Sequence, residues 1–83
     1  MISTTDHERF LTDWIAARNG LAADAVEPDT PLIEHGLLDS LRLLDLLLAL
    51  EERRGAPLDP TALGKGAFHD VKTIVARFLE ESR

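Results

Sequence analysis

The sequence predicts an all-α fold: an antiparallel four-helix bundle with one short helix and a long loop between helices one and two. Three observations support this class. In three segments, apolar residues recur at intervals of three and four, which is the spacing of one helix face. Each segment begins near a residue that can cap a helix, and two of them end near a glycine. No stretch shows the alternation of apolar and polar residues that is typical of a strand.

The first helix is expected over roughly residues 5–19. Thr5 and Glu8 have the spacing of a capping box, in which the side chains bond the free N–H groups of the first turn. Asn19 and Gly20 end the pattern. Trp14 is interpreted as a core anchor rather than a ligand-stacking residue. The apolar residues at helical spacing are Phe10, Leu11, Trp14 and Ile15.

A long connection follows over residues 20–39, and it contains Pro28, Pro31 and Gly36. Loops of this length are uncommon inside a compact domain and are often functional. Six apolar residues are expected to pin this one against the bundle: Leu21, Val26, Leu32, Ile33, Leu37 and Leu38.

The second helix is the most distinctive stretch, because seven of the ten residues 41–50 are leucine. Either Asp39 or Ser40 suits its N-cap, and Gly55 suits the position after its end. Arg53 and Arg54 complement the negative end of the helix dipole. The hydroxyl of Ser40 is therefore expected at the positive end of a helix.

The leucines are too many for one helix face. A stripe that should face the core consists of Leu43, Leu46, Leu47 and Leu50. A second row lies beside Asp45 and Glu52, and consists of Leu41, Leu44 and Leu48. Two interpretations stay open: the second row is an exposed docking surface beside Ser40, or all seven leucines fill the core.

After Gly55, residues 56–60 are expected to form a turn. A short helix is expected to start at Asp59-Pro60-Thr61, where Pro60 takes the tolerated first position. Asp70 is expected to cap a last helix over about 71–82. The core stripe of that helix is Val71, Ile74, Val75, Phe78 and Leu79.

Size and charge limit the possible functions. The 83 residues suffice for one domain, 1–83, with a single modest core. The net charge is −6, and residues 1–40 hold eight acidic and two basic residues, whereas residues 41–83 hold seven of each. Such a chain repels phosphate backbones, so no nucleic-acid partner is expected, whereas a basic patch on a protein would be attracted. Because the sequence has no targeting signal and no membrane-spanning apolar run, we expect a cytoplasmic protein without a membrane partner.

No catalytic or metal site is expected. Without cysteine, the chain has no thiolate ligand and no cysteine nucleophile. Ser40 lacks the flanking glycines of a hydrolase nucleophile elbow, since Leu38 and Arg42 occupy those positions. The three histidines show no triad or metal-ligand spacing and are expected to be solvated: His7, His35 and His69.

One motif surrounds Ser40. It reads Gly-Leu-Leu-Asp-Ser-Leu over residues 36–41, and the leucine-rich helix after it ends Leu-Glu-Glu-x-x-Gly at Gly55. The motif resembles the attachment site of phosphopantetheine-dependent carrier proteins, the acyl and peptidyl carriers, and the resemblance extends from about Phe10 to Leu79. It implies a protein that is not an enzyme and that binds 4'-phosphopantetheine covalently on Ser40, with Asp39 beside it. The arm would hold an acyl or aminoacyl group as a thioester and present it to partner enzymes of a biosynthetic pathway.

The resemblance also implies partners: a phosphopantetheinyl transferase, a loading ligase and a downstream transferase or synthase. Two leucines separate Gly36 from Asp39, a spacing similar to that of freestanding D-alanyl and other aminoacyl carriers. Acids and bases balance on the leucine helix, so it is nearly neutral, which favours a dedicated pathway over fatty-acid synthase enzymes. The alternative is an unmodified helical adaptor that binds a protein through this helix. We expect a monomer whose partners contact Leu38, Leu41, Leu44, Asp45, Leu48, Glu51 and Glu52.

Overall fold

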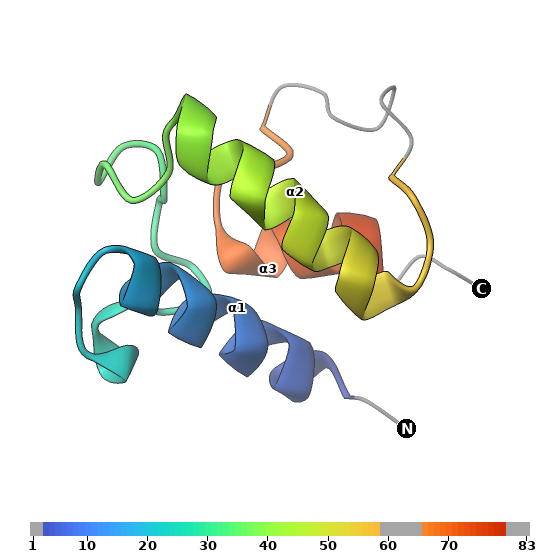
Figure 1. The fold of residues 1–83 in the computed structure, drawn as a ribbon. Helices are drawn as coiled ribbons and strands as arrows, with labels where there is room; N and C mark the ends of the chain where they lie inside the picture. Colours follow the sequence, from blue (N-terminus) through green and yellow to red (C-terminus); the bar gives the residue numbers. More distant parts are fainter. Residues whose placement is uncertain (1–2, 59–65, 80–83) are drawn as a thin grey trace.

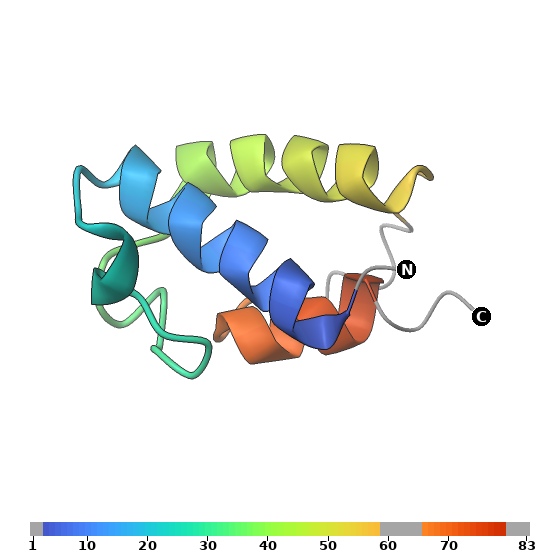
Figure 2. The same ribbon diagram turned by 90° about the horizontal axis from the view of Figure 1, so that it is seen from below.

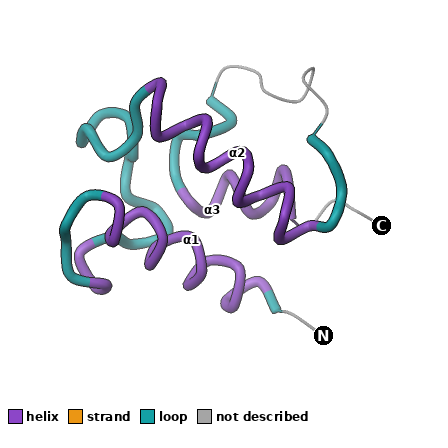
Figure 3. The backbone as a smooth tube through the Cα atoms, in the orientation of Figure 1, coloured by secondary structure: helices purple, strands orange, loops and turns teal. Residues whose placement is uncertain are grey.

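The computed structural model describes residues 3–58 and 66–79, and every regular element in these ranges is helical (Figures 1 and 3). The predicted all-α class is confirmed. The short helix expected from Asp59 and the part of the last helix beyond Leu79 lie outside the described residues. In chain order the elements are α1 (Thr4–Arg18), the 3₁₀ helix η1 (Ala23–Ala25), α2 (Ser40–Arg54), α3 (Val71–Ile74) and the π-helical segment η3 (Val75–Leu79), which continues α3.

Both long helices pack on the C-terminal helix. α1 contacts α3 and η3, and α2 contacts η3. α1 runs antiparallel to α2 and to the α3–η3 helix, while α2 and α3 run in the same direction (Figures 1 and 2). Within the described ranges, no helix has the length and apolar character needed to cross a bilayer.

One hydrophobic core lies between the helices. Leu46 and Leu50 of α2 are fully buried, and Leu43 and Leu47 pack half-buried against the core, which confirms the predicted stripe. Burial of one such side chain contributes about 1.5–3 kcal/mol. The largest fully buried side chains are Leu11, Ile15, Leu32, Leu46, Leu50, Val71, Ile74, Val75 and Phe78.

α1 begins earlier than the sequence analysis placed it. Its N-cap is Ser3, whose Oγ accepts the Asp6 N–H at 3.2 Å, and Asp6 Oδ2 accepts the Ser3 N–H at 3.4 Å. The expected capping box of Thr5 and Glu8 is therefore wrong. Thr5 lies inside the helix. The capping box is formed by Ser3 and Asp6, where the carboxylate of Asp6 takes the place that a glutamate usually has.

As predicted, Asp70 caps α3. The residue is nearly buried. Its Oδ1 accepts the Thr73 N–H at 2.8 Å, and its Oδ2 lies 3.0 Å from Nδ1 of His69. Burial alone raises the pKa of Asp70, but hydrogen bonds from the Thr73 side chain and backbone and from His69 lower it by more, so the pKa lies below its ordinary value. An ionised carboxylate is thus held at the positive helix end, where it is stabilised.

The loop between α1 and α2 is bonded to the start of the C-terminal helix (Figure 3). The Leu32 N–H donates to the His69 carbonyl at 2.8 Å, and the Lys72 N–H donates to the Pro28 carbonyl at 2.9 Å. Of the six apolar residues expected to pin the loop, Val26, Leu32 and Leu38 are buried and Leu37 is half-buried. Leu21 and Ile33 are exposed instead, and Ile33 directly follows the buried Leu32, so only one of these two neighbours faces the core.

Candidate functional site at the start of helix α2

Asp39 and Ser40 form the start of α2. Asp39 is the N-cap: its Oδ1 accepts the Arg42 N–H at 2.9 Å, and its carbonyl accepts the Leu43 N–H at 2.8 Å. Ser40 is the first residue of the helix. Of the two residues that could cap α2, Asp39 therefore takes the role, and Ser40 lies at the end where the helix dipole is positive.

Arg42 adds a positive charge to this helix end. Its Nη1 lies 3.2 Å from Asp39 Oδ2, and its Nη2 donates to the Arg18 carbonyl at 3.5 Å. Helix N-termini and guanidinium groups are both common partners of phosphate groups. The positive end of α2 therefore suits an anionic group at Ser40, with the negative charge of Asp39 offset by Arg42.

A small apolar hollow adjoins the same helix start. It has a volume of about 240 Å³ and is lined by Ile33, Leu38, Asp39 and Leu43. Small-molecule sites typically measure about 300–1,000 Å³. The hollow is below that range.

His35 and His69 are exposed, in line with the expectation that the histidines are solvated, whereas His7 is half-buried and departs from it. His7 Nδ1 accepts a hydrogen bond from Arg53 Nε at 3.0 Å, which links α1 to α2. His69 contacts the cap Asp70, as described above. His35 is exposed in the loop. His7 therefore helps to pack α1 on α2, and His69 contacts the residue that caps α3.

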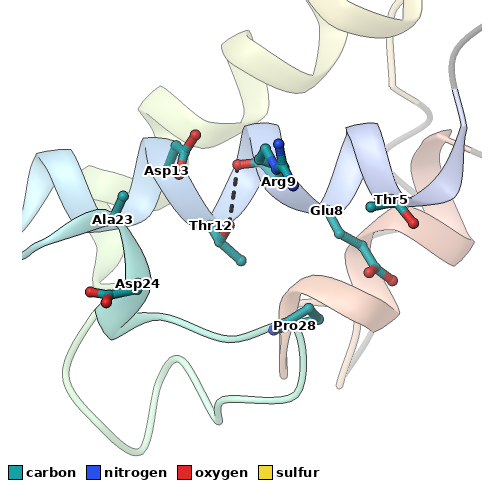
Figure 4. A pocket seen from close by; sticks show the side chains of 8 residues that line it. All are labelled: Thr5, Glu8, Arg9, Thr12, Asp13, Ala23, Asp24 and Pro28. Atoms are coloured by element: carbon teal, nitrogen blue, oxygen red, sulfur yellow. Dashed lines mark hydrogen bonds between the residues drawn. The ribbon is translucent and has the colours of Figure 1, made fainter.

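A second hollow belongs to α1 and η1 rather than to α2. It is an open groove of about 310 Å³, and Figure 4 shows its acidic side chains on these two elements. Thr12, which lines it, donates its hydroxyl to the Arg9 carbonyl at 3.1 Å. Nowhere in residues 3–58 and 66–79 do three or more acidic or histidine side chains come together in a way that could hold a metal ion. The lining residues are Thr5, Glu8, Arg9, Thr12, Asp13, Ala23, Asp24 and Pro28.

The outer face of α2 carries the three leucines of the second row. Leu41, Leu44 and Leu48 are 78%, 61% and 62% exposed. Their exposure rules out the interpretation that all seven leucines fill the core. Asp45 and Glu52 are also exposed.

The arginines of α2 are less exposed than Asp45 and Glu52, although acids and bases still balance along the helix. Arg42 pairs with Asp39, and the guanidinium carbon of Arg53 lies 4.3 Å from the ring centroid of Phe10 while its Nε bonds His7. All three arginines of α2 are half-buried, as is Glu51, so the exposed charged residues of the helix are Asp45 and Glu52. Long arginine side chains can fold back onto apolar surface, as Arg53 does on Phe10.

Two residues expected in the docking surface lie elsewhere. Leu38 is only 5% exposed, because it packs into the core ahead of α2. Glu51 is half-buried, and its Oε2 accepts the Leu58 N–H at 3.0 Å, so it holds the chain that leaves α2. Leu38 and Glu51 therefore support the fold around the site.

A family model described as the phosphopantetheine attachment site matches residues 9–78. The chain belongs to this family. Carriers of this family bind 4'-phosphopantetheine covalently on a serine, are not enzymes themselves, and interact with phosphopantetheinyl transferases and with synthases or ligases. A comparison with curated protein sequences finds no match to this carrier.

Proposed function

We propose that Ser40 is the attachment residue and that the carrier presents an acyl or aminoacyl group to enzymes of a biosynthetic pathway. Ser40 is the only serine in the matched residues 9–78, since Ser3 and Ser82 lie outside them. It is also the first residue of α2, and this placement is the observation that carries the proposal.

The start of α2 suits the arm for electrostatic reasons. The helix N-terminus and its dipole favour a phosphodiester there, and the guanidinium of Arg42 offsets the negative charge of Asp39. When attached, the arm supplies a terminal thiol, which this cysteine-free chain lacks, and the thiol holds the cargo as a thioester. Tethering raises the effective concentration of the cargo at each partner's active site. The chain itself binds, orients and presents.

We expect partners to recognise the outer face of α2. Leu41, Leu44 and Leu48 offer apolar contact, and Asp45 and Glu52 offer negative charge. An apolar groove flanked by lysine or arginine complements this combination. The transferase, the loading ligase and the downstream transferase or synthase are each expected to present such a groove.

Two features of the sequence favour a dedicated pathway. Acids and bases balance on α2, which favours such a pathway over fatty-acid synthase enzymes. The spacing of Gly36 and Asp39 resembles that of freestanding aminoacyl carriers.

Thiol titration tests the proposed function. Before modification the denatured chain should give no thiol, because it contains no cysteine. After incubation with coenzyme A and a phosphopantetheinyl transferase of broad specificity, it should give one thiol per chain. If no thiol forms while a known carrier is modified in the same reaction, the chain acts as an unmodified helical adaptor and the proposal fails.

A further inference from the structure

The C-terminal end of α1 is bonded to the loop just before Ser40. Asn19 follows α1, and its Nδ2 donates to the Ile15 carbonyl at 2.8 Å and to the Leu37 carbonyl at 3.1 Å. One amide nitrogen thus uses its two hydrogens to join the helix to the loop. Both bonds are partly buried. The backbone N–H of Asn19 bonds the carbonyls of Ile15 and Ala16, which holds its side chain at the helix end.

Arg42 makes a second link just after Ser40. Its backbone N–H and its guanidinium bond the two carboxylate oxygens of Asp39, at 2.9 Å and 3.2 Å. The same guanidinium donates at 3.5 Å to the carbonyl of Arg18, the last residue of α1. Asn19 and Arg42 therefore connect one end of α1 to both sides of Ser40.

These links matter because residues 37–39 belong to no helix. They are also held by the bond from the Leu37 N–H to the Leu32 carbonyl and the bond from the Leu43 N–H to the Asp39 carbonyl, both at 2.8 Å, and by the burial of Leu38. If Asn19 loses its amide, the partly buried Leu37 carbonyl loses its donor. An unsatisfied carbonyl destabilises the arrangement that contains it relative to arrangements in which water can reach it.

We propose that Asn19, together with Arg42, is a positioning residue that holds residues 37–42 in the arrangement that a phosphopantetheinyl transferase recognises. The inference rests on the proposed attachment at Ser40. If only part of the population has the recognised arrangement, the apparent affinity falls by that fraction, while the rate after binding is unchanged. Loss of the Asn19 bond should therefore raise KM for the carrier and leave kcat nearly constant.

The test compares Asn19→Ala with Ser3→Ala, a matched control at the other end of α1. Ser3→Ala removes the N-cap bond to Asp6, so it also weakens α1 but does not touch residues 37–42. At a temperature where all forms are folded, Asn19→Ala should raise KM for modification roughly fivefold, and Ser3→Ala should leave it unchanged. Arg42→Lys keeps the charge beside Asp39 but not the fork that also reaches Arg18, so a smaller rise is expected.

Amide hydrogen exchange gives a second readout that needs no transferase. The N–H groups of Arg42 and Leu43 are bonded to Asp39 at 2.9 Å and 2.8 Å, and they should exchange faster in Asn19→Ala and at the parental rate in Ser3→Ala. An equal KM for the two variants, or equal exchange of these amides, overturns the positioning role. If the parent itself is not modified, the proposed function of Ser40 fails, and the exchange rates alone decide whether Asn19 holds this segment.

Discussion

Changing Leu48 and Leu50 to alanine, one at a time, should separate docking from stability. The two residues are close together on α2, but Leu48 is 62% exposed whereas Leu50 is fully buried. Truncation of a fully buried leucine costs about 2–5 kcal/mol, a large share of the roughly 5–15 kcal/mol that stabilises a domain. For a domain of this size each kcal/mol lowers the melting temperature by about 4–8 °C. Leu50→Ala should therefore melt roughly 8–40 °C below the parent.

Leu48→Ala should behave in the opposite way. A surface substitution usually changes stability by no more than about 0.5 kcal/mol, so its melting temperature should stay within roughly 4 °C of the parent. Loading of the modified carrier by its cognate ligase should nevertheless slow about fivefold or more, since truncation of a central interface residue costs about 1 kcal/mol or more. Thermal melts followed by circular dichroism and initial rates of loading measure the two effects. A Leu48 variant that melts as low as the Leu50 variant, or that loads at the parental rate, refutes the docking face.

Three further predictions concern an acid, a glycine and the loop charges. The pKa of Asp70 is lowered in the fold, so its carboxylate stabilises the protein above the unfolded pKa of about 3.9, and this stabilisation is lost as pH falls through the folded pKa. Asp70→Asn should therefore lose less stability than the parent between pH 6 and pH 3, as measured by urea denaturation. Equal pH dependence in parent and variant would count against this role. Gly55→Ala should lower the free energy of unfolding by about 1–2 kcal/mol in the same assay, because residue 55 has a φ of 73°, which alanine disfavours. No atom lies within 4 Å of the new Cβ, so the effect is one of backbone conformation. An unchanged denaturation midpoint would contradict it. The three loop acids to be neutralised together are Glu27, Asp29 and Glu34. The variant should associate more slowly with a basic partner in stopped-flow measurements, and its association rate should depend less on salt. Parental rates at low salt would show that other residues attract the partner.

The features that the sequence predicted well are those set by local physics. Asp39 and Asp70 cap helices because a short acidic side chain reaches the N–H three residues on, at 2.9 Å and 2.8 Å. Gly55 ends α2 because the left-handed conformation favours glycine. The buried stripe of α2 follows from helical spacing. These signals lie within a few residues of one another and need no knowledge of the rest of the fold.

The features that the sequence missed depend on contacts between distant residues. The pair of Arg53 and His7 joins positions 46 residues apart, and the bond from Asn19 to Leu37 spans 18. In the sequence, Asn19 indicated only a helix end. The partial burial of Arg53 was missed for the same reason, since it depends on contacts with Phe10 and His7. The shifted capping box differs, because Ser3–Asp6 and Thr5–Glu8 both have suitable spacing and the actual helix start decides between them.

Intact mass spectrometry of the parent and of Ser40→Ala, after incubation with coenzyme A and a phosphopantetheinyl transferase, tests the central claim most directly. We predict that the parent gains the mass of one phosphopantetheine group and that Ser40→Ala gains none. Peptide mapping of the modified parent should place the group on the peptide that contains Ser40. Modification of the alanine variant, or a parent that gains no mass beside a carrier that does, would contradict the assignment of Ser40 as the attachment residue.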